Sequence, residues 1–403
     1  MAIPFEIAPL DDGVTAPWGF TAAGVTAGLK ASGRPDLAIV ATDTPVTAAA
    51  VLTTNQVKAA PVVVTAEHLA ASGGRARAVL LNAGSANACT GLEGLATARE
   101  ACDLVAHHLG CDAHEVLICS TGVIGVPIDR PAYLAGIPKV VAAAAPEGGA
   151  DAAEAIMTTD LVAKEAAVHV TDAEGGSATV GGMCKGSGMI APTMATMLCV
   201  VTTDAPLEGE EAAAILRRAT DRTFNRISVD GVMSTNDTIV LLASGTAVTP
   251  PDADAVEAGI TAVLGDLATQ VVRDGEGAQR LVRITVRGAL AEDDALAVAR
   301  QVGTDDLVKT AVAGGDPNWG RIIAAVGASP VLIDPGSVDI AVGDVTVCTG
   351  GMAAPFDRAA AEAVMAADEV QVTIDLGLGD AEATFLTCDL THGYITINAE
   401  YTT

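Results

Sequence analysis

A threonine that follows a small residue, at the end of a glycine-rich segment, is the feature of this sequence with the clearest chemical potential. The segment from Gly181 to Leu198 reads GGMCKGSGMIAPTMATML, with Thr196 directly after Ala195. A threonine hydroxyl can attack the preceding peptide carbonyl, and the freed residue then carries a nucleophilic hydroxyl and an α-amine that can act as its base. Glycines at this density are equally typical of a plain flexible loop. The segment therefore raises self-cleavage as a hypothesis and leaves the loop interpretation open.

A second candidate is Ser120–Gly125, which follows the apolar run Val116–Cys119. Such a run is typical of a buried strand. At a strand exit, the Thr121–Gly122 pair can direct a backbone N–H, together with the threonine hydroxyl, at an oxygen that becomes negative during acyl transfer. A simple turn is the alternative interpretation.

Charged and polar residues elsewhere suit a substrate with both an ammonium and a carboxylate group. Lys185 lies within the glycine-rich segment, and Glu276 lies between two glycines after an apolar helical pattern. Either charge can bind substrate or simply face water. Asn398–Thr403 ends the sequence with small polar residues, which are usually a frayed tail.

Histidines and cysteines gather in one stretch, at His107, His108, Cys111, His114 and Cys119. On one helix, His107 and Cys111 have the spacing of zinc ligands. Gly110 and Asp112 interrupt the helical pattern there, however, and Cys119 lies in the predicted strand. We therefore expect no metal site.

Nucleotides and nucleic acids are disfavoured as ligands. Gly181–Gly188 lacks the Gly-Lys-Ser/Thr order of a phosphate-binding loop, and no Gly-x-Gly-x-x-Gly opens a helix after a strand. The net charge of −28 gives an acidic surface that repels a phosphate backbone. We expect no nucleic-acid partner and no resident cofactor.

The composition favours a soluble protein with a large core. Half of the 403 residues are hydrophobic and 18% are charged, which argues against disorder. Met1–Leu10 lacks a basic region, and the eight cysteines form no Cys-x-x-Cys pair. We therefore expect no signal peptide, reduced thiols and a cytoplasmic location.

Apolar runs and alanine-rich helical patterns alternate along the chain. Strands are predicted at Leu37–Ala41, Ala78–Leu81, Val116–Cys119, Leu198–Thr202, Ile284–Val286, Asp339–Val342 and Val370–Ile374. Helices are predicted at Leu95–Leu109, Ile137–Ala145, Gly209–Thr223, Asp254–Val272, Ala291–Val302 and Asp357–Ala366. With aromatic residues at only 2%, small side chains suit a layered α/β arrangement. We expect an α/β core over residues 1–280 and a smaller α+β domain over residues 281–403.

Several segments in a fixed order carry a resemblance that covers nearly the whole chain: Gly13–Gly28, Ser120–Gly125, Ile156–Asp160, Lys185–Leu198, Ser234–Thr238, Gly315–Arg321 and Ile397–Thr403. Together they resemble the signature of the ornithine acetyltransferase (glutamate N-acetyltransferase, ArgJ) family of arginine biosynthesis. The resemblance implies an αββα-type sandwich core with a smaller C-terminal domain. It also implies cleavage between Ala195 and Thr196, into an α chain of 1–195 and a β chain of 196–403 that assemble as an α2β2 heterotetramer.

The resemblance further implies a ping-pong reaction in which Thr196 takes acetyl from N2-acetylornithine and passes it to glutamate. Thr121 and Gly122 would form the oxyanion hole. The substrate-binding residues would be Thr158 or Thr159, Lys185, Thr196, Glu276, Asn398 and Thr403. Acetyl-CoA as a further donor stays open. These roles agree with acyl transfer, which needs a nucleophile, a proton carrier and an oxyanion site.

Some positions depart from the family pattern. Thr193 replaces a frequent asparagine, Val232 and Met233 stand where Asp-Thr is common, and Asn82–Asn87 contains an unusual alanine and serine. These departures bear on acceptor choice and on cleavage rate.

Two other functions compete with the acetyltransferase. One is an aminopeptidase or amidase of related architecture, whose acyl-enzyme is captured by water. The other is an uncut protein that binds a small molecule without catalysis.

Overall fold

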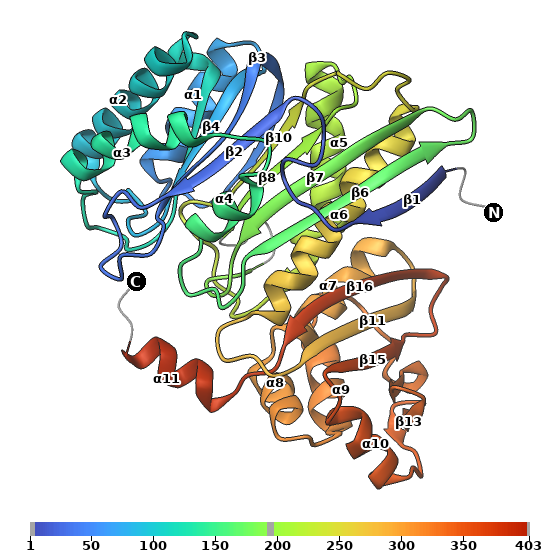
Figure 1. Ribbon diagram of the computed structural model, residues 1–403. Helices are drawn as coiled ribbons and strands as arrows, with labels where there is room; N and C mark the ends of the chain where they lie inside the picture. The colour runs from blue at the N-terminus through green and yellow to red at the C-terminus, as the bar shows by residue number, and fades with distance from the viewer. Residues whose placement is uncertain (1–4, 192–196, 401–403) are drawn as a thin grey trace. The chain divides into compact units, whose positions relative to one another are not determined.

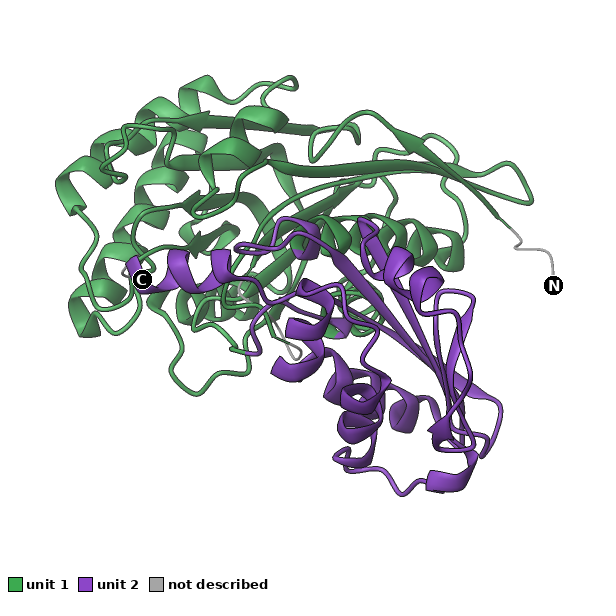
Figure 2. Ribbon diagram, turned by 90° about the horizontal axis from the view of Figure 1, so that it is seen from below, with its two compact units in different colours: residues 1–225, 232–271, 402–403 green, residues 226–231, 272–401 purple. Residues whose placement is uncertain are grey.

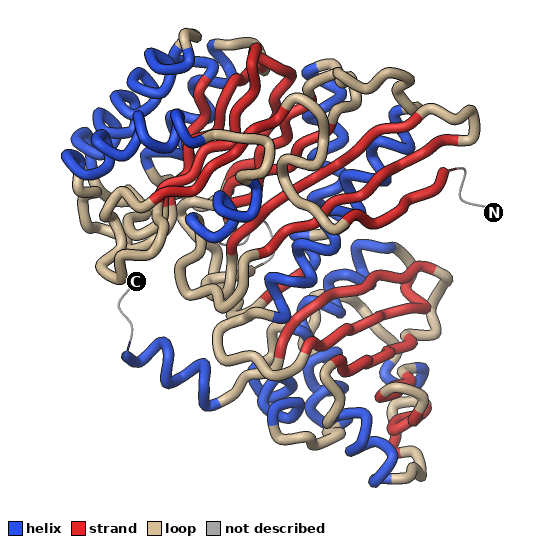
Figure 3. Tube along the Cα trace, viewed as in Figure 1, coloured by secondary structure: helices blue, strands red, loops and turns tan. Residues whose placement is uncertain are grey.

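The computed structural model describes residues 5–191 and 197–400, and the chain divides into two compact units. Unit 1 contains residues up to 225 together with 232–271, and unit 2 contains residues 226–231 and 272–401 (Figure 2). The sequence-based boundary after residue 280 therefore lies inside unit 2. Both units combine a sheet with helices, as Figure 3 shows, so the α/β prediction is confirmed.

Unit 1 is built on a mixed sheet that contains nine strands among the described residues, in the order β1-β6-β7-β8-β10-β3-β4-β5 with β2 paired to β3 (Figure 1). The strands are β1 (Phe5–Leu10), β2 (Phe20–Val25), β3 (Leu37–Leu52), β4 (Arg75–Asn82), β5 (Val116–Ser120), β6 (Lys164–Asp172), β7 (Ser177–Lys185), β8 (Leu198–Thr203) and β10 (Thr238–Ala243). The β4–β5 and β8–β10 pairs are parallel, and the other pairs are antiparallel.

Helices cover the sheet of unit 1 and bury its alternating side chains. One core cluster joins Leu80 and Ile118 to α1 (Ala60–Ala71), α2 (Gly91–Leu109) and α3 (Arg130–Ala143). A second cluster, on the other face, combines Val79 and Leu81 with residues of β7, β8, β10 and α4 (Gly149–Ala155). The further helices α5 (Gly209–Arg222) and α6 (Ala253–Arg273) pack on β3 and β7 respectively. The layered prediction is therefore confirmed.

Unit 2 contains a seven-stranded sheet among its described residues, in the order β14-β13-β12-β15-β11-β16-β9. Its strands are β9 (Ile227–Ser228), β11 (Leu281–Ala289), β12 (Asp339–Val342), β13 (Val345–Thr349), β14 (Met352–Ala353), β15 (Glu369–Asp375) and β16 (Ala381–Cys388). Its helices are α7 (Glu292–Gly303), α8 (Asp306–Ala313), α9 (Trp319–Gly327), α10 (Arg358–Met365) and α11 (His392–Glu400). One apolar core of this unit joins the sheet to α7, α8, α9 and α10.

Short 3₁₀ segments lie along the whole chain, at Ala113–Glu115, Phe224–Arg226 and Pro335–Ser337.

The glycines at the start of the chemically suggestive segment do not form a flexible loop. Gly181 and Gly182 lie in β7, which is buried up to Lys185. A Cβ on Gly181 would lie 2.1 Å from the Gly13 carbonyl oxygen, and one on Gly182 would lie 2.9 Å from Val263. These glycines are needed because neighbouring chain segments approach closely, so the loop interpretation is wrong for this part.

Helix α6 is the described helix that is long and apolar enough, by length and composition, to cross a bilayer. Of the most apolar stretch of this helix, 56% is buried inside the protein. Its residues Val263 and Leu267 pack against β7. A core helix of a folded domain has the same composition.

Candidate active site

The segment that contains Thr196 leaves and re-enters the sheet at one place. Lys185 ends β7, Leu198 begins β8, and these two residues are register partners in the antiparallel pair. Residues 192–196, including the proposed cleavage site Ala195–Thr196, lie outside the described residues. The sheet thus fixes both ends of the segment side by side.

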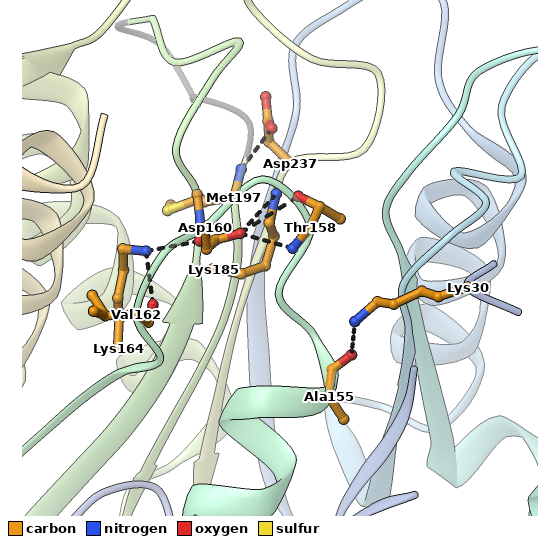
Figure 4. A network of polar contacts seen from close by, with 10 residues as sticks. Lys30, Ala155, Thr158, Asp160, Val162, Lys164, Lys185, Met197 and Asp237 are labelled. Carbon is orange, nitrogen blue, oxygen red and sulfur yellow. Dashed lines mark hydrogen bonds and ion pairs between the residues drawn. The ribbon is translucent and has the colours of Figure 1, made fainter. Parts of the chain in front are cut away.

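Asp160 is the centre of a buried polar network beside this point (Figure 4). Its Oδ1 accepts hydrogen bonds from Lys164 Nζ at 2.8 Å and from the Gly186 N–H at 2.7 Å. Its Oδ2 accepts the Thr158 N–H at 2.9 Å and lies 3.9 Å from Lys185 Nζ. Burial alone would raise the pKa of Asp160, but the charges of Lys185 and Lys164 outweigh it and hold that pKa well below its usual range. Asp160 is therefore ionised.

Among residues 5–191 and 197–400, two lysines face the one carboxylate at the centre of this network. Asp160 faces the two lysines Lys164 and Lys185, whose side chains are 0% and 3% exposed. Lys30 lies near the same network and donates to the carbonyl oxygens of Pro35 at 2.6 Å and Ala155 at 3.1 Å. Burial is the main cause that lowers the pKa of Lys30 to about 8. Because Coulomb attraction is strong in a buried setting, this positive charge suits a carboxylate.

The Thr158–Thr159 pair lies on the loop that leads into this network. Thr158 is tied to Asp160 through its N–H, and its hydroxyl lies 3.4 Å from Asp160 Oδ2. Both threonines are half-buried. The loop therefore presents two neighbouring hydroxyls, and the choice between them stays open.

The Thr121–Gly122 pair follows β5 and offers two hydrogen-bond donors. The Thr121 N–H is already used, because it donates to the Asn82 carbonyl oxygen at 2.9 Å. The Gly122 N–H and the Thr121 hydroxyl have no partner among residues 5–191 and 197–400. Gly122 has φ +130°, and a Cβ there would lie 2.4 Å from the Gly84 carbonyl carbon, so only glycine fits. This arrangement suits stabilisation of an oxyanion.

In unit 2, Glu276 and Asn398 lie together. Asn398 Nδ2 donates to Glu276 Oε2 at 2.7 Å, and Glu276 is 8% exposed. Asn398 belongs to α11, so the frayed-tail interpretation is wrong up to Glu400. A Cβ on Gly277 would lie 2.2 Å from the Tyr394 nitrogen, which explains the glycine beside this carboxylate. Thr403 lies outside the described residues.

The histidine–cysteine stretch has ordinary structural roles. Gly110 ends α2 in the left-handed conformation, as expected from the sequence. His114 lies 2.8 Å from the Asp112 carboxylate, and Cys119 is buried in β5, where burial raises the pKa of its thiol to about 12. Elsewhere, the acidic side chains of Asp172, Glu174 and Asp252 approach one another on the surface, which is common without a metal.

The residues that depart from the family pattern lie partly within the described chain. Val232 is exposed, and the Met233 carbonyl oxygen accepts a hydrogen bond from Asn55 Nδ2 at 3.2 Å. Thr193 lies outside the described residues.

Sequence reasoning assigned no role to the buried polar residues Asp160, Asn236 and Asp237, although they lie in two segments that carry the family resemblance, Ile156–Asp160 and Ser234–Thr238. Asn236 and Asp237 precede the apolar strand β10 and are 4% and 0% exposed. A polar pair directly before a buried apolar run was the available signal. It is weak, because such pairs more often lie in turns at the surface.

The fold and the site define a class: a two-unit α/β protein in which a glycine-rich strand, a buried lysine–aspartate network and a pair of spare donors suit acyl transfer. Residues 21–403 match the model of the ArgJ family. The chain is 47% identical over 397 residues to the arginine biosynthesis bifunctional protein ArgJ of Mycobacterium tuberculosis, covering 96% of each chain. It is 48% identical to the protein of that name from Symbiobacterium thermophilum, covering 98% of this chain and 99% of that relative. The chain therefore belongs to the ArgJ family.

Solved structures include relatives from the same family. The argJ protein of Bacillus halodurans has 40% identity and a TM-score of 0.48, covering 50% of this chain and 97% of that chain. The ornithine acetyltransferase of Mycobacterium tuberculosis, complexed with ornithine, has 46% identity and a TM-score of 0.42, covering 46% and 98%. The family assignment itself rests on the sequence relatives. With it, the acyltransferase class and the place in arginine biosynthesis expected from the sequence are confirmed.

Proposed function

We propose that this chain cuts itself between Ala195 and Thr196 and then moves acetyl from N2-acetylornithine to glutamate. The observation that carries the proposal is the Ala195–Thr196 pair between β7 and β8, in a chain of the ArgJ family. The products of the transfer are ornithine and N-acetylglutamate.

Self-cleavage needs the Thr196 hydroxyl as its nucleophile. Its Oγ attacks the Ala195 carbonyl carbon, and the Thr196 nitrogen leaves as an amine, so that an ester joins the two residues. Water then hydrolyses the ester and leaves a carboxylate on Ala195. Thr196 keeps its hydroxyl and gains an α-amine, whose ordinary pKa of about 7.7–8 provides a neutral base near neutral pH.

Acetyl transfer uses the same hydroxyl. Thr196 Oγ attacks the acetyl carbonyl of acetylornithine, the ornithine amine leaves with a proton, and an acetyl-threonine ester remains. The glutamate α-amine then attacks this ester and regenerates the hydroxyl. The spare donors of Thr121 and Gly122 support their role as the oxyanion hole in both steps.

Charged residues would select the amino-acid substrates. The positive charge at Lys185 supports binding of a carboxylate, and Glu276 supports binding of an ammonium group. We assign one of Thr158 and Thr159, together with Asn398 and Thr403, to the same substrates.

The proposed function also includes a second acetyl donor and the assembly of the two cleavage products. The curated relatives are named as bifunctional proteins, which agrees with a second activity. We propose acetyl-CoA with glutamate for that activity, and no resident cofactor. We propose that the α chain 1–195 and the β chain 196–403 assemble as a cytoplasmic α2β2 heterotetramer, with no nucleic-acid or membrane partner.

Intact-mass analysis of purified protein tests the mechanism. We expect two chains, the second beginning at Thr196, whereas Thr196→Ala gives one inactive polypeptide. A single uncut chain with full activity would overturn self-cleavage. Incubation with acetylornithine and glutamate separates transfer from hydrolysis: acetylglutamate supports the transferase, and acetate released regardless of glutamate supports the amidase.

A further inference from the structure

Two adjacent buried side chains directly before β10 connect the two segments to which the chemistry is assigned. Asn236 Nδ2 donates to the carbonyl oxygen of Ser120 at 2.9 Å and to that of Ala86 at 2.6 Å. Asp237 Oδ1 accepts the Met197 N–H at 3.1 Å (Figure 4). One dipeptide therefore contacts both segments through its two side chains.

These contacts lie one residue away from the proposed reacting groups. Ser120 is bonded directly to Thr121, and the Met197 nitrogen belongs to the peptide bond that it shares with Thr196. The backbone of the dipeptide is itself held, because the Thr53 N–H donates to the Asp237 carbonyl oxygen at 2.9 Å. The next N–H, of Thr238, donates to the Met197 carbonyl oxygen at 3.1 Å. The dipeptide is therefore fixed relative to both segments.

We propose that Asn236 and Asp237 act as a positioning clamp, which holds Met197, the neighbour of the proposed nucleophile, relative to Ser120, the neighbour of the proposed oxyanion donors. The inference rests on the proposed function, because it takes its nucleophile and its oxyanion hole from there. Acyl transfer is sensitive to such positioning, and a displacement of about 1 Å can cost on the order of a hundredfold in rate.

The clamp works through hydrogen bonds that do not require a charge on Asp237. Asp237 is 0% exposed, and its Oδ2 has no hydrogen-bond partner among the described residues. Burial raises the pKa of this carboxyl well above its usual value, although the Met197 N–H opposes the shift. A neutral carboxylic acid offers one acceptor and one donor, and an asparagine side chain offers the same pair.

Substitutions of Asp237 separate positioning from proton transfer. We expect Asp237→Ala to slow self-cleavage by about ten- to a hundredfold, and to lower kcat of the fully cut protein similarly while KM changes less than about twofold. Asp237→Asn should restore both rates to within about threefold of the wild type, because it keeps the Met197 contact. If Asp237→Asn is as slow as Asp237→Ala, the positioning role is overturned in favour of proton transfer by the acid.

The matched control is Asp204→Ala. Asp204 is a second buried carboxyl, just beyond the other end of β8, and it accepts the Thr179 N–H at 2.8 Å. Its replacement should lower the thermal stability and leave the cleavage rate unchanged. Slow cleavage in this control would show that any lost buried carboxyl has the same effect, which overturns the clamp.

Asn236→Ala is a second variant that tests the clamp independently if Asp237→Ala does not fold. It removes the contact to Ser120 without touching a carboxyl, and we again expect a lower kcat at an unchanged KM. Wild-type cleavage and kcat in Asn236→Ala overturn the clamp. If the wild-type protein itself stays uncut or makes no acetylglutamate, the proposed function is wrong. The clamp is then wrong as well, because it rests on that function.

Discussion

At the scale of single residues, Thr121 uses its backbone N–H for a hydrogen bond, whereas its hydroxyl has no partner among the residues that the structure describes. Its N–H pairs with Asn82, and its hydroxyl is left as a donor beside the Gly122 N–H. We expect Thr121→Ala to lower kcat by about ten- to a thousandfold, as the loss of one oxyanion donor does. Thr121→Ser, which keeps a hydroxyl, should stay close to the wild type. Steady-state kinetics with acetylornithine and glutamate measure the effect.

Thr65 provides the control for this prediction. Its buried hydroxyl donates to the Ile118 carbonyl oxygen at 2.7 Å and accepts the Ile118 N–H at 2.9 Å, so it is bonded to β5 away from the strand exit. Thr65→Ala should cost stability without lowering kcat. An unchanged kcat in Thr121→Ala would remove Thr121 from the oxyanion hole.

At the scale of elements, Asp160 joins parts of unit 1 that are distant in sequence. Its carboxylate binds the loop at Thr158, the start of β6 at Lys164 and the residue after β7 at Gly186. Lys185, at the end of β7, also lies within ion-pair distance. One buried carboxylate therefore fixes the loop and the lysine to which substrate binding is assigned.

Asp160→Asn should destabilise the protein by about 3–5 kcal/mol near neutral pH, because it leaves buried lysine charges without their partner. The pKa of Asp160 is lowered in the folded protein, so its stabilising effect is full above the unfolded-state pKa of about 3.9 and is lost as the pH falls below that value. Denaturant unfolding at several pH values should thus show a difference between variant and wild type that narrows in acid. The exposed Asp43→Asn serves as the control. A difference that stays constant down to acid pH would contradict the assigned ion pairs.

The sequence predicted the elements whose pattern is continuous and apolar. Leu198–Thr202 and Val370–Ile374 lie in β8 and β15, and Asp254–Val272 lies within α6. The helix predicted to end at Ala145 ends at Ala143, and it begins earlier, at Arg130. The β6–β7 pair was not predicted, because the polar residues of β6 and the glycines of β7 obscure the alternation. Those glycines are required by close packing against distant parts of the chain, which the local sequence does not reveal.

The site was predictable only where the chemistry is local. A hydroxyl, a glycine or a charge can be recognised within a short segment of sequence. This is why Thr196, the Thr121–Gly122 pair and Lys185 could be predicted as site residues. The clamp residues could not, because their partners Ser120 and Met197 lie far away in sequence. Those contacts depend on the strand order that puts β10 between β8 and β3, and no local pattern specifies that order.

At the scale of the whole molecule, the proposed cut divides unit 1 within its sheet. Residues 1–195 supply β1 to β7, whereas residues 196–403 supply β8 and β10. In the strand order these two lie together between β7 and β3. Six register pairs join β7 to β8, and six join β10 to β3. The apolar side chains of β8 and β10 also share one core cluster with β3, β4 and β5.

We therefore expect the two cleavage products to stay together as one folded body. Separation would expose paired backbone groups and a continuous apolar core, both of which are costly in water. Under native conditions the chains of 1–195 and 196–403 should elute together in size-exclusion chromatography, at the volume of the uncut Thr196→Ala control. They should separate only at denaturant concentrations that also abolish the circular dichroism of the fold. Release of the 1–195 chain in native buffer would contradict the shared sheet, because no product could leave it without opening both strand pairs.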